Sequence, residues 1–112
     1  TNDIPLPFWT KGLDLKMRGF NRAFIERHLQ GKKVSDYINV SDSIFWGEQY
    51  NPQWKVNDLQ VIRTKKAHLF IEVNENGKKI YNYKFPILTA GEVLGVAGIE
   101  YLNLDEILKL QL

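Results

Sequence analysis

Residues 67–101 read AHLFIEVNENGKKIYNYKFPILTAGEVLGVAGIEY, three apolar or alternating runs separated by two glycine-containing turns. Short runs of β-branched and aromatic residues between such turns are typical of strands. Asn76-Gly77 supplies the positive φ angles that a tight hairpin needs. We therefore expect a three-stranded antiparallel meander with strands at 69–73, 80–88 and 93–101.

The third run of this meander is rich in small residues. It contains Gly95, Ala97 and Gly98. Small residues inside a strand leave room for another group to approach the sheet closely. This room is the first indication of a binding site.

The residues on either side of the meander predict a hairpin and several helices. Asn21 and Asn51 precede helical patterns as N-caps, and Asn103 caps a last helix with Glu106 three residues on. The predicted elements are strands at 8–10 and 17–20, a helix at 22–30, short helical turns at 33–38 and 43–46, the longest helix at 52–63, and a final helix from 103.

The final helix carries an apolar stripe, formed by Leu104, Ile107, Leu108 and Leu112. A helix this short is marginal alone, so the stripe is expected to dock on the domain, on a second copy, or to continue into a longer helix. We place a domain at 1–102 and the start of a C-terminal linker helix at 103–112. The start at Thr1, without an initiator methionine, indicates a segment of a longer protein.

The amino-acid composition limits the functions that the chain can have. The 112 residues are enough for one domain. The net charge is only +2, and acidic and basic residues are mixed along the chain, so the sequence shows no basic patch that would bind nucleic acid. The chain has no cysteine, which excludes disulfides, thiolate metal sites and cysteine nucleophiles. No apolar run approaches the ~20 residues that span a bilayer, so we expect no membrane segment and a cytoplasmic location.

Catalytic and metal-binding patterns are absent from the sequence. His28 and His68 are isolated, so we interpret both as surface or rim side chains and predict no metal site. No phosphate loop or serine elbow occurs, so we predict no catalytic residue and no enzyme. The scattered carboxylates are interpreted as solvated charges or hairpin partners: Asp14, Glu26, Asp36, Glu48, Asp58 and Glu72.

Three runs together resemble a PAS domain, the sensory module of bacterial and eukaryotic signalling proteins: PFWTKGLDLKMRGFNRAF, NDLQVIRTKK and KFPILTAGEVLGVAGIEY. The resemblance implies an α+β fold, with a five-stranded antiparallel sheet, short helices and one longer helix on one face, and a C-terminal exit helix. Without cysteine, the photochemistry of light-sensing members is excluded. Haem and noncovalent flavin remain compatible with the family, but the sequence supports neither, and we expect no cofactor.

Either face of the second strand of the meander could point into the core. Hydrophobicity would turn Tyr81, Tyr83 and Phe85 inward, whereas the family pattern turns Asn82 and Lys84 inward. We adopt the second arrangement. A buried lysine needs a carboxylate partner, either from the protein, where Glu72 is nearest in sequence, or from a ligand.

This arrangement predicts a pocket between the sheet and the helices. Apolar walls with a few polar groups are typical of small-molecule sites. The alternative is that Phe24, Trp46 and Trp54 are plain core. The expected ligand-binding residues are Lys84, Asn82, Ala97, Gly95, Phe24, Trp46, Trp54 and Val61.

The resemblance implies a non-catalytic sensor from a bacterial signal-transduction protein, such as a two-component system, or from a transcription regulator. It would bind a small molecule, which could carry a carboxylate, and relay the change to an output domain through rearrangement of a homodimer. The main alternative is a ligand-free dimerisation or protein-interaction module. A small α+β enzyme of another fold is a third, and it would need an acid or base buried in a cleft.

Overall fold

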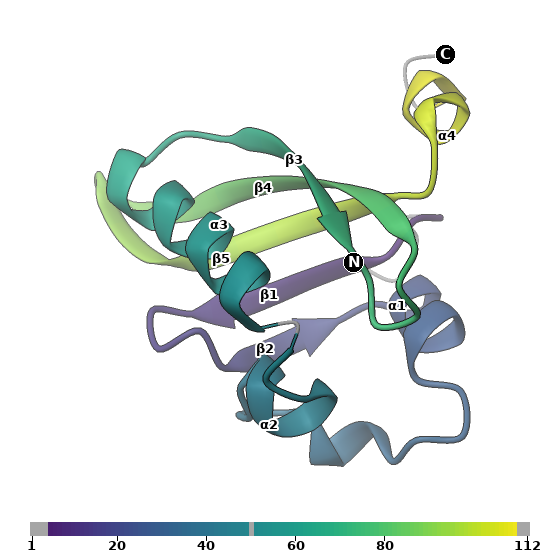
Figure 1. The fold of residues 1–112 in the computed structure, drawn as a ribbon. Helices are drawn as coiled ribbons and strands as arrows, with labels where there is room; N and C mark the ends of the chain where they lie inside the picture. The colour runs from purple at the N-terminus through teal and green to yellow at the C-terminus, as the bar shows by residue number, and fades with distance from the viewer. Residues whose placement is uncertain (1–4, 50, 110–112) are drawn as a thin grey trace.

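The computed structural model describes residues 5–49 and 51–109. Five antiparallel strands form one sheet in the order β2-β1-β5-β4-β3, with α1, α2 and α3 on one side of it (Figure 1). The elements are β1 (Phe8–Gly12), β2 (Met17–Phe20), α1 (Arg22–His28), the 3-10 helix η1 (Val34–Asp36), α2 (Asp42–Trp46), α3 (Asn51–Thr64), β3 (His68–Val73), β4 (Lys79–Thr89), β5 (Glu92–Tyr101) and α4 (Leu104–Lys109).

The predicted meander is confirmed, and its two turns differ. Ala90 and Gly91 both have positive φ, 51° and 81°, and they join β4 to β5 as a two-residue turn. Between β3 and β4 the loop is five residues long, and only Gly77 has positive φ. The prediction of a positive φ at Asn76 was wrong, because the Asn74 side chain caps this longer loop by accepting two of its backbone N–H groups.

The first helix is positioned by its cap, as the sequence predicts. The Asn21 Oδ1 accepts from the backbone N of Phe24 and of Phe8, each at 3.0 Å, and its Nδ2 donates to the Leu6 carbonyl at 2.9 Å. One side chain therefore fixes the start of α1 against β1. The helix ends at His28, two residues before the predicted end.

The long helix lies over the sheet and contacts β3, β4 and β5 (Figure 1). The predicted capping by Asn51, and Leu112 of the terminal stripe, concern side chains outside the described residues. None of the helices in the described ranges is long and apolar enough to span a bilayer.

The inner face of β4 is the one that the family pattern predicts. Asn82 and Lys84 are buried, and Lys84 is 1% exposed, whereas Tyr83 on the opposite face is 39% exposed. The hydrophobicity rule fails here because charged partners from other elements meet Lys84 in the interior. The buried apolar cluster beside it comprises Trp9, Met17, Phe24, Leu29, Tyr37, Val61 and Val96.

The small residues of β5 make room for β1. A Cβ at Gly98 would lie 2.3 Å from Cζ2 of Trp9, and one at Gly95 would lie 2.1 Å from the Lys11 carbonyl oxygen. The expected free space beside Gly95 is therefore filled by the neighbouring strand. Glycine is required at these positions by close packing within the protein.

Replacing Gly98 tests this packing. We expect Gly98→Ala to displace the Trp9 ring and to lower the free energy of unfolding by about 1–3 kcal/mol, as overpacking does. Gly19→Ala is the matched control, since its nearest neighbour, Thr10 Oγ1, is at an ordinary 3.4 Å, and it should change stability by less than about 0.5 kcal/mol. Urea unfolding measures both, and equal stability of the two variants would contradict the close contact.

Candidate functional site

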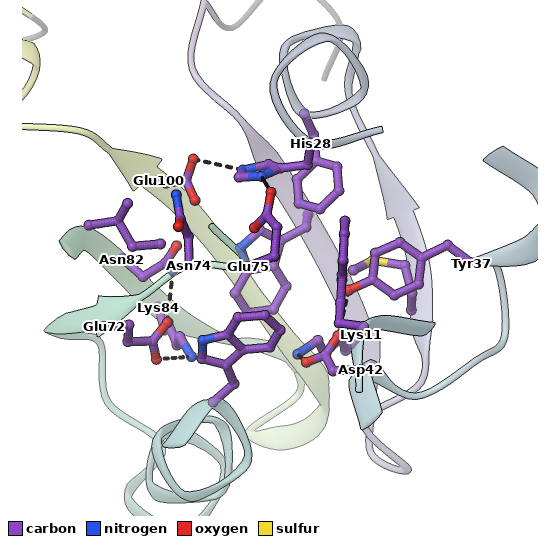
Figure 2. A pocket seen from close by; sticks show the side chains of 16 residues that line it. Lys11, His28, Tyr37, Asp42, Glu72, Asn74, Glu75, Asn82, Lys84 and Glu100 are labelled. Atoms are coloured by element: carbon purple, nitrogen blue, oxygen red, sulfur yellow. Dashed lines mark hydrogen bonds and ion pairs between the residues drawn. The ribbon is translucent and has the colours of Figure 1, made fainter. Parts of the chain in front are cut away.

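A cavity of about 50 Å³ lies between the inner face of the sheet and the helices (Figure 2). Each enclosed water needs roughly 10–15 Å³ of such space, so the cavity has room for only a few non-hydrogen atoms. Its apolar lining is Trp9, Met17, Phe24, Tyr37, Trp46, Trp54 and Ile80. Its polar lining is Lys11, His28, Asp42, Glu72, Asn74, Glu75, Asn82, Lys84 and Glu100.

Five buried charges of alternating sign are linked by ion pairs, and we call them the buried charge chain: Asp42, Lys11, Asp58, Lys84 and Glu72. All of them except Asp58 line the cavity. Lys11 Nζ lies 2.5 Å from Asp42 Oδ2 and 2.7 Å from Asp58 Oδ2. Lys84 Nζ lies 2.7 Å from Asp58 Oδ1 and 2.5 Å from Glu72 Oε2. Each lysine therefore has a carboxylate on both sides, and Asp58 of α3 joins β1 to β4.

The ionisation of the chain follows from these contacts. Burial disfavours the charge on Asp58, but Lys11 and Lys84 outweigh it and hold the Asp58 pKa below its ordinary value. Burial likewise opposes the Lys11 charge, but Asp58 and Asp42 raise the Lys11 pKa above its ordinary value. Both groups are thus charged at neutral pH.

Tyr37 closes the chain at its Asp42 end. Its hydroxyl donates to Asp42 Oδ1 at 2.5 Å. Burial, with the adjacent Asp42 charge, raises the Tyr37 pKa well above its ordinary value. The phenol therefore stays neutral and acts as a donor.

The expected pairing of Lys84 with Glu72 is confirmed. Glu72 was interpreted as a solvated charge or a hairpin partner, and it is a hairpin partner, because it contacts Asn82 and Lys84 of the adjacent strand β4. The same interpretation was wrong for Asp58, which is 0% exposed and lies on α3 between two lysines. Lys11 and Asp42 were not predicted at all. The signal for Lys11 was its place two residues after Trp9, on the same face of β1.

A second polar cluster lies at the His28 side of the cavity. The His28 Nδ1 lies 2.5 Å from Glu75 Oε2, and its Nε2 lies 2.8 Å from Glu100 Oε2. Burial alone would lower the His28 pKa, but the hydrogen bonds to Glu100 and Glu75 raise it to about 9. His28 is therefore a buried, doubly donating cation, and its prediction as a surface or rim residue was wrong.

Neither histidine belongs to a metal-binding group in the part of the chain that the structure describes. There, no three residues of the His, Asp and Glu types are placed to hold an ion. His68 is half-buried, and its Nε2 lies 3.1 Å from the hydroxyl of Thr64. It does not line the cavity.

Five of the eight predicted ligand-binding residues line the cavity: Lys84, Asn82, Phe24, Trp46 and Trp54. Val61 is fully buried in the apolar cluster instead. Gly95 and Ala97 fall on the other face of the sheet, because the register sets Ala97 opposite Phe85 and Gly95 opposite Ile87. The residue opposite Lys84 is Gly98, which sequence spacing alone did not reveal.

Asn82 has a hydrogen-bonding atom left over. Its Nδ2 donates to Glu72 Oε1 at 2.9 Å. Its Oδ1 is buried and has no hydrogen-bond partner among the described residues. Buried acceptors are nearly always paired, so this atom marks a point where a bound group would fit.

No protein-family model and no curated protein matches the chain. Solved structures do. The VqmA-ligand-DNA complex of Vibrio cholerae is 21% identical, with a TM-score of 0.68, and the match covers 88% of this chain and 46% of that one. The phage VqmA-DPO complex is 18% identical, with a TM-score of 0.72, and the match covers 98% and 52%.

The PAS domain of Bordetella pertussis BvgS is 16% identical, with a TM-score of 0.71, and the match covers 98% of this chain and 88% of that one. These matches confirm the predicted PAS-like α+β fold, with its five-stranded antiparallel sheet. The chain spans about half the length of the VqmA chains it matches.

Breaking the buried charge chain tests its importance. We expect Lys84→Met to lower the free energy of unfolding by about 3–5 kcal/mol, because Asp58 and Glu72 lose their shared cation in the interior. Lys79→Met, at an exposed position of the same strand, should change it by less than about 0.5 kcal/mol. Chemical denaturation compares the two, and wild-type stability of Lys84→Met would contradict the pairing.

The raised pKa of His28 predicts a pH dependence. Because the folded-state value, about 9, exceeds the ordinary value of about 6.5, the stabilisation is complete below about 6.5 and is lost as pH rises through about 9. An NMR titration of the His28 ring should show the high midpoint, and Glu100→Gln should lower it. The exposed Glu92→Gln on the same strand should leave it unchanged, and a wild-type midpoint near 6.5 would refute the cluster.

Proposed function

We propose that this PAS-like domain is the non-catalytic sensory part of a larger bacterial regulatory protein, and that it binds a small molecule in the cavity. The observation that carries the proposal is the cavity itself, with its aromatic walls and the unpartnered Asn82 Oδ1. Two structures of the same fold are complexes of VqmA proteins, one with a ligand and DNA and the other with DPO. An output domain elsewhere in the parent chain, of the transcription-regulatory or two-component kind, is part of this proposal.

The exit helix offers a route by which binding would be relayed. Arg27 bridges Glu100 Oε2 at 3.2 Å and Glu106 Oε2 at 3.4 Å, and Glu106 belongs to α4. Glu100 is also the partner of His28 in the cavity wall. A ligand that moves Glu100 would therefore shift the contact that positions α4.

Pairing with a second copy would use the outer face of the sheet. This face exposes a row of large apolar side chains on β3 and β4: Leu69, Ile71, Val73 and Tyr83. Contiguous exposed apolar surface of this kind marks interaction sites. The exposed Leu104 and Leu108 of α4 supply further apolar surface for such a homodimer.

The second candidate function is a ligand-free dimerisation module. It is favoured by one observation, that Lys84 is paired with two carboxylates of the protein and needs no ligand for charge balance. The two functions differ in whether the cavity is occupied in the working protein.

Filling the cavity separates the two functions. Ile80 lines the cavity and Ile87 lies on the opposite face of the same strand, so Ile80→Phe should block binding and Ile87→Phe should not. In native mass spectrometry after gentle purification, we expect a bound small molecule on the wild type and on Ile87→Phe, and none on Ile80→Phe. A wild type without any bound mass, and without a thermal shift from small amines, alcohols or carboxylates, would favour the dimerisation module.

A further inference from the structure

The orientation of the Asn82 amide is fixed by chemistry. Glu72 accepts hydrogen bonds through its carboxylate, so the Asn82 atom 2.9 Å from it must be the donating Nδ2. The acceptor Oδ1 is therefore left over in a residue that is 6% exposed. A ligand that satisfies it must offer an N–H or O–H donor.

The charge of the lining selects among donors. Four carboxylates face the cavity against three cationic side chains, and Asp58 behind the two lysines makes a fifth. Arg27, outside the lining, bridges Glu100 and Glu106, and including the charges of both Arg27 and Glu106 leaves the balance unchanged. The site thus has an excess of negative charge, which a cation reduces and a carboxylate increases. The expectation of a carboxylate ligand rested on an unpaired Lys84, and Lys84 has two partners.

The aromatic wall also suits a cation. Lys84 Nζ already lies 5.5 Å from the centre of the Trp9 ring, and the centres of the His28 and Phe24 rings lie 4.8 Å apart. Aromatic faces attract cations, and Trp54 adds a further ring to the lining.

We infer that the cavity takes a small primary amine, bound as its ammonium form, with one N–H donated to Asn82 Oδ1. This inference rests on the proposed function and names the ligand class for it. The cavity volume limits the amine to a few non-hydrogen atoms.

The test compares three probes that share a three-carbon skeleton by NMR titration of the whole chain: n-propylamine, n-propanol and propionate. We expect n-propylamine to bind most tightly, with shifts of the Asn82 side-chain amide and of the cavity residues. Propanol should bind more weakly, and propionate should leave these signals unchanged. This comparison needs no variant, so it stays decisive whatever a substitution does to folding.

Two variants then locate the contact. Asn82→Leu removes the acceptor and should weaken n-propylamine binding about tenfold or more. Asn57→Leu is the matched control, because Asn57 Nδ2 donates to the same Glu72 carboxylate at 2.8 Å but does not line the cavity, and it should change the affinity by less than about twofold.

The outcomes distinguish this inference from the function on which it rests. Tighter binding of propionate or propanol, or wild-type affinity of a folded Asn82→Leu, would overturn the amine and leave the sensor proposal standing. Failure of all three probes would also overturn the amine, and the sensor proposal would then be decided by the comparison of Ile80→Phe with Ile87→Phe.

Discussion

The position of Asp58 between two lysines is the interaction on which the interior depends. Its two carboxylate oxygens, on α3, each accept from a different strand, Lys11 of β1 and Lys84 of β4. A buried charge is tolerated only where partners surround it, and here signs alternate along the whole chain of five. The long helix is therefore held over the sheet by directional contacts, and the aromatic side chains fill the space around them.

Local signals made most of the fold predictable. Asn21 shows its capping role in sequence because the cap and its helix are adjacent, and Ala90-Gly91 interrupts an alternating pattern. The residues of the site were harder to predict from the sequence. Lys11 lies 31 residues from Asp42 and 47 from Asp58, so no spacing rule connects them. The misplacement of Gly95 and Ala97 shows the same limit, since the pairing register between strands decides the face on which each residue lies.

The two polar clusters lie at different sides of the cavity and contact different helices. Figure 2 shows His28 and Glu100 at one side, and Lys11 and Asp42 at the other. On the first side, Arg27 pairs with both Glu100 and Glu106 and so connects the cavity wall to α4. On the second side, the ion pair between Lys11 and Asp58 anchors α3. Asn82 pairs with Glu100 in the register of β4 and β5, and its amide donates to Glu72 of the charge chain. A ligand bound at Asn82 would therefore touch both the fixed part of the interior and the part that leads to the exit helix.

A crystal structure of protein purified without dialysis is the most direct test of the buried charge chain and of the cavity. We expect Lys84 Nζ to lie between Asp58 and Glu72, and density for a compact group to lie within hydrogen-bond distance of Asn82 Oδ1. Density that shows Lys84 turned away from both carboxylates, or Asn82 Oδ1 bonded to another side chain of the protein, would contradict this expectation.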